Sequence, residues 1–227
     1  MVGVAEGIRS HEPIVPIYVD IVNMMCYVAS VNISGDIGGD MGGGMEILVL
    51  DGNPDPAHRA WEEYLGAFAK ALDRVGAGVR TCTLWEMDIH YCTGCWSCWW
   101  KTPGLCTFKD DMTGVYPAML GADIVVWASP LVMGNVSALT KKAQDRFIPL
   151  LHPYIELVNG ESHHRRRYPR NIDMGLIIEP AAGDTREDAE IVRHMHERLA
   201  LNGRGRLRFF ATTARGAEEV ANEAVGA

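Results

Sequence analysis

Hydrophobic and polar positions alternate along the chain in two patterns, short apolar runs and longer amphipathic stripes. Short apolar runs bounded by turn residues are typical of buried strands. Each run here is five or six residues long, which suits strands better than helices. The runs that predict strands are residues 46–50, 79–84, 123–128, 174–178 and 207–211.

Two amphipathic stripes between these runs predict helices. In the first, apolar residues recur at three- and four-residue spacing until Gly76 and Gly78 end the pattern. A second helix is predicted to begin at Asp184, whose side chain would cap it while Glu187 reaches back, and to end at Asn202-Gly203. The expected buried faces are Trp61, Leu65, Phe68, Leu72 and Val75 in the first helix, and Ile191, Val192, Met195 and Leu199 in the second.

Strands that alternate with helices predict an α/β domain, with a parallel sheet covered by helices on both faces. Ligands of such sheets bind beyond the carboxyl ends of the strands. We therefore expect the functional site in the loops at 51–59, 129–135 and 179–184. The long segment 87–111 leaves the second strand at the same end, so its chemistry is expected there too.

Residues 1–44 differ from the rest of the chain. Their apolar stretch, Ile14 to Ile33, is interrupted by Pro16 and Asp20, which disfavours a membrane span, and no basic segment leads an unbroken apolar run as in a secretory signal. A glycine-rich stretch follows. We predict a poorly ordered extension at 1–44 and one domain at 45–227, in a cytoplasmic protein that contacts no membrane. The net charge of −8 also argues against nucleic-acid binding.

Four cysteines form a compact motif, C-x2-C-x2-C-x7-C, at Cys92, Cys95, Cys98 and Cys106. Thiolates at this spacing can surround one metal centre, and Gly94 and Pro103-Gly104 supply the turns that close ligation needs. Three cysteines at successive two-residue gaps favour an iron–sulfur cubane over zinc, which more often uses two separated pairs. Reduced or redox-active thiols are the other alternative.

The segment Tyr91–Met112 contains this motif and ends in Asp-Asp-Met. Together with Ser129–Arg146, it resembles the flavodoxin-like NADPH-dependent FMN reductase family, in its iron–sulfur flavoprotein branch. The resemblance covers about 45–214. It implies a flavodoxin-like three-layer sandwich with a five-stranded parallel sheet in the order 2-1-3-4-5, FMN at the switch between strands one and three, and a homodimer or homotetramer. It also implies that the four cysteines bind a [4Fe–4S] cluster.

The same resemblance assigns the isoalloxazine ring to one loop, in which Leu131 and Met133 would offer apolar surface and backbone amides would meet the polar edge. The loop could equally be a plain β–α turn with Ser137 as a helix cap. The residues assigned to the ring are Ser129, Pro130, Leu131, Val132, Met133, Gly134 and Asn135.

The loop for the FMN phosphate departs from the family pattern, because the sequence DGNPDPAHRAW contains neither Ser nor Thr. Asn53, His58, Arg59 and free amides at the helix start remain as phosphate contacts. His58 and Arg59 could equally be exposed residues of the first helical turn. This departure leaves room for a different flavin or a lost one.

These features predict an FMN-dependent oxidoreductase that passes electrons from NAD(P)H or a ferredoxin-type donor to a small-molecule acceptor. Hydride transfer to a flavin requires no acid–base residue, so none is assigned. The alternatives are a non-catalytic electron carrier and a zinc-stapled binding protein. Asp110 and Asp111 are adequately explained as helix caps. The basic run 161–170 is better explained as a solvated loop or subunit contact than as an anion site.

Overall fold

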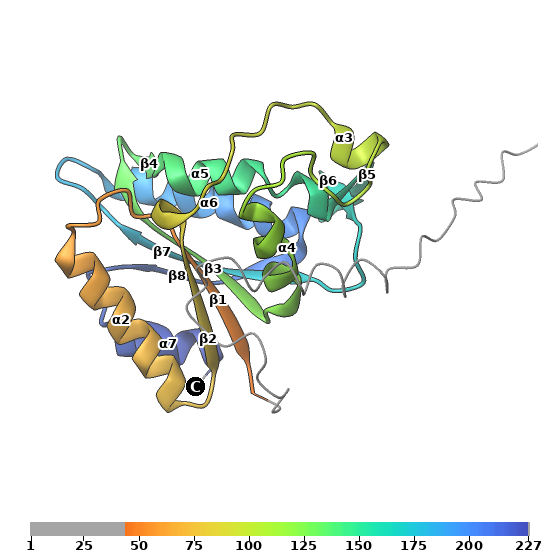
Figure 1. The fold of residues 1–227 in the computed structure, drawn as a ribbon. Coiled ribbons are helices and arrows are strands. Elements are labelled where there is room, and N and C mark those ends of the chain that lie inside the picture. The colour runs from red at the N-terminus through yellow and green to blue at the C-terminus, as the bar shows by residue number, and fades with distance from the viewer. Residues whose placement is uncertain (1–43, 227) are drawn as a thin grey trace, which may run out of the picture.

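The computed structural model describes residues 44–226 (Figure 1). The predicted extension, residues 1–44, thus lies outside the described residues apart from its last position. The strands are β1 (Glu46–Asp51), β2 (Gly78–Thr83), β3 (Ile124–Val132), β4 (Asn135–Val136), β5 (Leu151–Val158), β6 (Glu161–Arg166), β7 (Ile172–Glu179) and β8 (Arg204–Thr212). The helices are α2 (Arg59–Arg74), α3 (Ser97–Trp100), α4 (Met112–Gly121), α5 (Ala138–Asp145), α6 (Arg186–Asn202) and α7 (Ala217–Val225), with short 3-10 turns η2 (Leu84–Glu86) and η3 (Ile148–Leu150).

The central sheet has five parallel strands in the order β2-β1-β3-β7-β8. This confirms the predicted flavodoxin-like order, with β7 and β8 as the fourth and fifth strands. The short strand β4 adds to β3 in antiparallel direction. In the register between β1 and β3, Asp51 lies beside Ala128, so the loops that follow these two strands start side by side.

Side-chain alternation along the strands divides the core into two layers. In β1, Ile47 and Val49 pack with α2 and α7, whereas Leu48 and Leu50 point to the opposite face, which α4, α5 and α6 cover. Figure 1 shows these two groups of helices on opposite sides of the sheet. Burial on both faces explains why the strands read as nearly continuous apolar runs. None of the helices described within residues 44–226 has both the length and the apolar content of a membrane span.

Helix α2 follows the predicted stripe with one change at its end. Trp61, Phe68 and Leu72 are buried, but Val75 is the half-exposed residue that caps the helix. Gly76, which has a φ of 79°, closes the turn: its amide N–H donates to the carbonyl of Asp73. The apolar stripe therefore predicted the buried face correctly but extended one residue beyond the end of the helix.

Helix α6 begins one residue later than predicted. Its N-cap is Thr185, and the capping box pairs Thr185 with Asp188 rather than Asp184 with Glu187. Asp184 instead accepts a hydrogen bond from the amide of Ala181 within the preceding loop. The buried face is also displaced, toward Ala189, Val192, His196 and Ala200. Ile191 and Met195, which were expected to be buried, are half exposed.

A second, two-stranded sheet consists of β5 and β6, which the sequence analysis did not predict. Its turn, Asn159-Gly160, has positive φ at both residues, the conformation that Asn-Gly favours in hairpins. The basic run forms β6 and the segment after it. Arg165 pairs with Glu156, and Arg170 pairs with Asp123. The run is therefore largely a strand and not the solvated loop that was expected, and these two of its arginines are paired within the chain.

Candidate functional site

The loop assigned to the flavin ring is largely strand. β3 continues through Val132, and Met133-Gly134 form a two-residue turn into β4, with Leu131 opposite Val136 and Val132 opposite Asn135. Both turn residues have positive φ, 54° at Met133 and 75° at Gly134, as in a type I′ hairpin turn. The expectation of a loop at 129–135 is therefore wrong for Ser129–Val132, because β4 gives β3 a partner beyond the parallel sheet.

This β3–β4 hairpin is fixed to the loop that follows β1. The amide of Gly52 donates to the carbonyl of Ala128 at 2.8 Å, and the Ser137 hydroxyl donates to the carbonyl of Gly52. Ser129 Oγ accepts from the amide of Ser137 at 2.9 Å. A Cβ at position 52 would lie 1.8 Å from Thr140 Oγ1, so only glycine permits this approach. The two predicted loops thus meet at the carboxyl edge of the sheet.

Exposure rises along β3 toward the turn of the hairpin. Leu131 is 3% exposed and belongs to the core, whereas Val132 is 49% exposed and Met133 is 98% exposed. The apolar surface available to a ring therefore comes from Val132 and Met133, not from Leu131. A left-handed backbone costs a residue other than glycine about 1–2 kcal/mol. The chain accepts this cost at Met133, whose apolar side chain is fully exposed.

The phosphate candidates in the β1–α2 loop are all bound to other groups of the chain. Asn53 is buried, and its side-chain amide donates to the carbonyl of Asp55 at 2.7 Å. His58 accepts from the amide of Trp61 through Nδ1, and its Nε2 lies 2.6 Å from Glu179 Oε2. Arg59 is exposed and pairs with Glu62 at 2.7 Å. Glu179 was not predicted as a site residue, although it is the last residue of β7 and the first of the loop 179–184, where we expected the functional site.

The four cysteines of the motif line one cavity, together with Phe108 and Arg146. Cys92 and Cys95 are exposed at its mouth, Cys106 is half-buried and Cys98 is buried, and all four are free thiols. Gly94 and Gly104 have positive φ and turn the chain as predicted, and Trp96 does so too. Within residues 44–226, no three histidine, cysteine, aspartate or glutamate side chains are arranged to hold a single metal ion.

The electrostatics of the cavity suit a cationic centre. Hydrogen bonds from the backbone and side chain of Ser97 lower the pKa of Cys95 to about 7. Burial raises the pKa of Cys98 to about 11, and the neighbouring thiolates of Cys106, Cys92 and Cys95 contribute to the shift. The four sulfurs are thus close enough to repel one another as anions. A cluster of iron ions would remove that repulsion, and thiolates are the donor type that iron–sulfur centres use.

The Asp-Asp-Met sequence closes the base of the cysteine loop, and neither of its carboxylates caps helix α4 by a hydrogen bond. Asp110 is buried and forms two hydrogen bonds with Arg146, at 2.6 and 3.0 Å. Arg146 also donates to the carbonyl of His90, and Asp111 accepts from the amide of Asp88. Asp111 is the N-cap of α4 but makes no side-chain cap bond. The two ends of the loop are therefore joined to each other and to the end of α5.

Burial by itself would raise the pKa of Asp110, but the hydrogen bonds from Arg146 and from the amide of His90 outweigh burial and hold it below its usual range. The guanidinium of Arg146 lies 5.3 Å from the centre of the Phe108 ring, which stacks on His90. This buried cation lines the cysteine cavity, while its carboxylate partner lies behind it. Sequence analysis missed Arg146, because a basic residue at a helix end carries no signal of burial.

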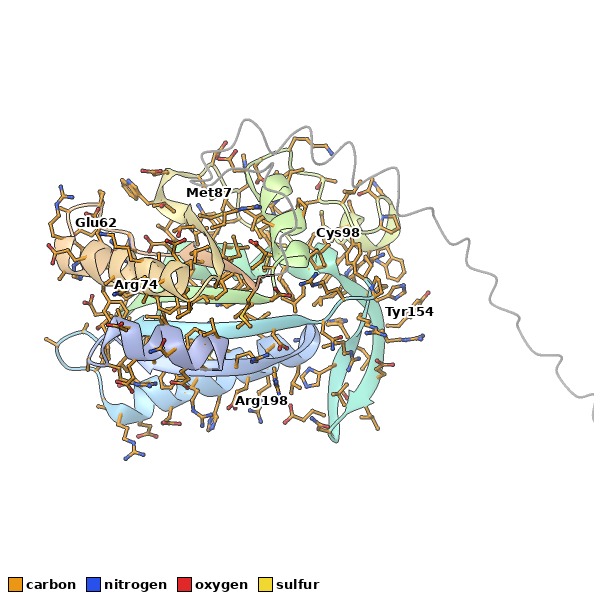
Figure 2. The ribbon with its side chains drawn as sticks, turned by 90° about the horizontal axis from the view of Figure 1, so that it is seen from below. Glu62, Arg74, Met87, Cys98, Tyr154 and Arg198 are labelled. Atoms are coloured by element: carbon orange, nitrogen blue, oxygen red, sulfur yellow. The ribbon has the colours of Figure 1, made fainter. Side chains whose placement is uncertain are left out.

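The cysteine cavity does not lie at the carboxyl edge, contrary to expectation. Its walls include Arg146, Ile148 and Pro149, which follow the end of α5, whereas the β3–β4 hairpin precedes the start of α5. Figures 1 and 2 agree: α3 and Cys98 lie at one end of the molecule, and the start of α2 with Glu62 lies at the other. From Ser137 to Arg146, α5 spans roughly 14 Å at about 1.5 Å per residue.

Residues 45–164 match the family model described as NADPH-dependent FMN reductase. The chain belongs to this family. Among curated relatives, an iron–sulfur flavoprotein of Archaeoglobus fulgidus is 36% identical over 88 residues, 39% of each chain. An iron–sulfur flavoprotein of Methanocaldococcus jannaschii is 34% identical over 132 residues, 58% of this chain and 60% of that one. The matches thus span 39% to 60% of these two relatives.

Solved structures support the fold of this FMN reductase family member. An NAD(P)H:quinone oxidoreductase from Methanothermobacter marburgensis superposes with a TM-score of 0.54 at 14% identity, over 81% of this chain and 95% of that one. At this identity the likeness shows the fold alone.

Proposed function

We propose that this chain is an FMN-dependent oxidoreductase that passes electrons from NAD(P)H or a ferredoxin-type donor to a small-molecule acceptor. Membership of the FMN reductase family supports flavin use. The observation that carries the proposal is the β3–β4 hairpin, which holds Met133 exposed in a strained turn beside the loop after β1. This is the strand crossover at which α/β sheets bind ligands.

In this proposal the hairpin positions the flavin and the chain supplies no proton. Val132 and Met133 would cover one face of the ring and exclude water from it, and backbone groups of the turn would meet its polar edge. The bonds from Ser137 and Gly52 hold the hairpin rigid against β1, so the ring is received by a preformed surface. When bound, the flavin accepts a hydride and releases electrons singly. No catalytic acid or base is assigned.

We propose further that Cys92, Cys95, Cys98 and Cys106 hold a [4Fe–4S] cluster. Support comes from the shared cavity, the mutual repulsion of the thiolates and the names of the relatives. A cluster at this place would supply one-electron transfer at the end of the molecule remote from the hairpin. The buried Asp110–Arg146 pair would hold the loop around it.

Anaerobic purification tests both cofactors. We expect flavin absorption and a broader iron–sulfur absorption that bleaches with dithionite, together with iron and sulfide in equal amounts. Alanine at any of the four loop cysteines should abolish iron and leave flavin content unchanged, whereas Cys82→Ala, in the core, should keep both. Zinc in place of iron, or protein that takes up no iron during reconstitution, would refute the cluster. A disulfide mechanism would make only two of the cysteines necessary.

Steady-state turnover separates an enzyme from an electron carrier. We expect purified protein with bound flavin to oxidise NADPH or NADH with a quinone as acceptor. If reduced nicotinamides fail while a reduced ferredoxin still reduces the flavin, the donor is of ferredoxin type. Failure of both donors would favour the non-catalytic carrier.

We also propose that the protein forms a homodimer or homotetramer in which α6 contacts a second copy. The two half-exposed apolar residues of α6, Ile191 and Met195, interrupt an otherwise charged surface. Met195→Glu should lower the mass measured by light scattering, and Glu187→Gln at the exposed start of the same helix should not. A native protein that is monomeric at all concentrations would refute this proposal.

A further inference from the structure

A phosphate bound at the start of a helix needs backbone N–H groups that are free to donate to it. Flavodoxin-like domains offer such groups in the loop between the first strand and the first helix. Here that loop runs from Gly52 to Arg59, and it contains two prolines, Pro54 and Pro56, which have no N–H. The remaining six amides decide whether the loop can receive a phosphate.

Every one of these amides already donates to an acceptor within the chain. Two of the acceptors are carboxylates and one is an asparagine side chain, so the side chains of the loop occupy the positions that a bound anion would take. The pairs are Gly52 to the Ala128 carbonyl, Asn53 to Asp51 Oδ1, Asp55 to Asn53 Oδ1, Ala57 to Asp55 Oδ1, His58 to the Asp55 carbonyl and Arg59 to the Ala57 carbonyl.

Beyond the loop, one donor in the first turn of helix α2 is also used, at Trp61. The amide of Trp61 donates to His58 Nδ1, and the Trp61 indole donates to Asp51 Oδ1 at 2.8 Å. The start of α2 is therefore capped by an imidazole nitrogen of the chain itself. A phosphate would have to displace these bonds, and each displaced donor and acceptor would need a new partner.

The charges around the loop also disfavour a phosphate dianion. Asp55 and Glu179 contribute carboxylates, and Asp51 adds a third, whose pKa is raised by burial. The nearby basic groups are already paired, His58 with Glu179 and Arg59 with Glu62. A phosphate dianion at this edge would be repelled by these carboxylates, and the β1–α2 loop offers no unpaired cation to offset the repulsion.

We propose that this chain recognises the ring of its flavin and gains no affinity from the phosphate, so that riboflavin binds as tightly as FMN. The inference rests on the proposed flavin function and specifies its ligand class. The ring surface consists of the side chains of Val132 and Met133, which belong to the hairpin and not to the β1–α2 loop, so ring recognition stands without a phosphate site.

Titration of flavin-free full-length protein with riboflavin and with FMN, followed by quenching of flavin fluorescence, tests this directly. We expect the two Kd values to agree within threefold. Lowering the ionic strength should weaken FMN relative to riboflavin, because screening of the acidic loop decreases. FMN binding more than threefold tighter, or tightening at low salt, would overturn the inference while leaving the flavin function intact. Binding of neither flavin would overturn both.

A designed gain of phosphate affinity provides the second test. Asp55→Ser removes a carboxylate and frees the Ala57 amide, so FMN should tighten at least threefold while riboflavin is unchanged. Asp73→Asn makes the same change of charge at the exposed far end of α2 and should alter neither affinity. Thermal melts of both variants establish that they are folded. If Asp55→Ser changes the Kd of FMN and the Kd of riboflavin by the same factor, this carboxylate does not govern phosphate binding and the inference is overturned.

Discussion

At the scale of single residues, two turns of similar backbone conformation carry different sequences. The β5–β6 turn uses Asn159-Gly160, and the β3–β4 turn uses Met133-Gly134, with positive φ at all four positions. Asn is well suited to this conformation and Met is not. The exposed methionine therefore lowers stability at a place where asparagine would serve the fold better, which supports a role in ligand contact.

Met133→Asn should accordingly stabilise the protein and weaken flavin binding. We expect the free energy of unfolding to rise by up to about 1 kcal/mol, since the left-handed backbone costs asparagine less. Urea unfolding measures the stability, and fluorescence quenching measures the flavin affinity. Val158→Thr, beside the other turn, is the control and should leave flavin affinity unchanged. Unaltered affinity in Met133→Asn would exclude Met133 from the ring surface.

Asp110 stabilises the cysteine loop through a fully buried ion pair. Asp110→Asn leaves the Arg146 charge without its partner, so the free energy of unfolding should fall by about 3–5 kcal/mol. Glu62→Gln breaks an exposed pair and should cost less than about 1 kcal/mol. Urea unfolding at pH 7 compares the two variants. Similar losses in both would contradict the role given to Asp110.

At the scale of elements, α5 and α6 meet through a buried histidine. His196 Nδ1 lies 2.8 Å from the carbonyl of Val192, and its Nε2 lies 2.7 Å from the side-chain amide nitrogen of Gln144. A neutral ring satisfies both contacts by donating from Nδ1 and accepting at Nε2. Burial lowers the pKa of His196, and the hydrogen bond to Val192 opposes this only in part.

This histidine should make stability depend on pH. Its folded pKa lies below the unfolded value of about 6.5, so its contribution is fully present above that pH and is lost as pH falls toward the folded pKa. Melting temperature should fall from pH 7 to pH 5, and the fall should be smaller in His196→Gln. His194→Gln, at an exposed position of the same helix, should keep the native dependence. If the melting temperature of His196→Gln falls with pH as steeply as that of the native protein, the prediction is refuted.

At the scale of the whole molecule, the described domain has a core layer on each face of its sheet and places its two candidate centres at opposite ends of α5. Ring binding at the hairpin and metal binding in the cysteine cavity use different elements. Loss of one centre should therefore leave the other in place, as the cysteine variants test.

The segment before the domain should be dispensable. Its apolar stretch is interrupted and a glycine-rich stretch separates it from the first strand, so deletion of residues 1–44 should change neither melting temperature nor flavin content. Thermal unfolding and absorption spectra of the shortened chain measure both. A melting temperature lower by more than a few degrees would show that the segment packs on the domain or between subunits.

The sequence by itself determined the elements that depend on residues close to one another along the chain. Apolar runs located the parallel strands because both faces are buried, and the compact cysteine spacing located the loop cavity because its turns involve near neighbours. The Asn159-Gly160 turn was also readable, although the β5–β6 hairpin was not predicted.

Only the tertiary structure decided which distant groups meet. Asp110 joins Arg146 across 36 positions, and His58 joins Glu179 across 121. No local pattern encodes these partners, because each depends on how the strands and α5 pack. Tertiary packing also placed the cysteines away from the carboxyl edge. The hydrogen bonds of the β1–α2 loop mostly join near neighbours in the sequence, but only the folded backbone fixes which acceptor each amide uses.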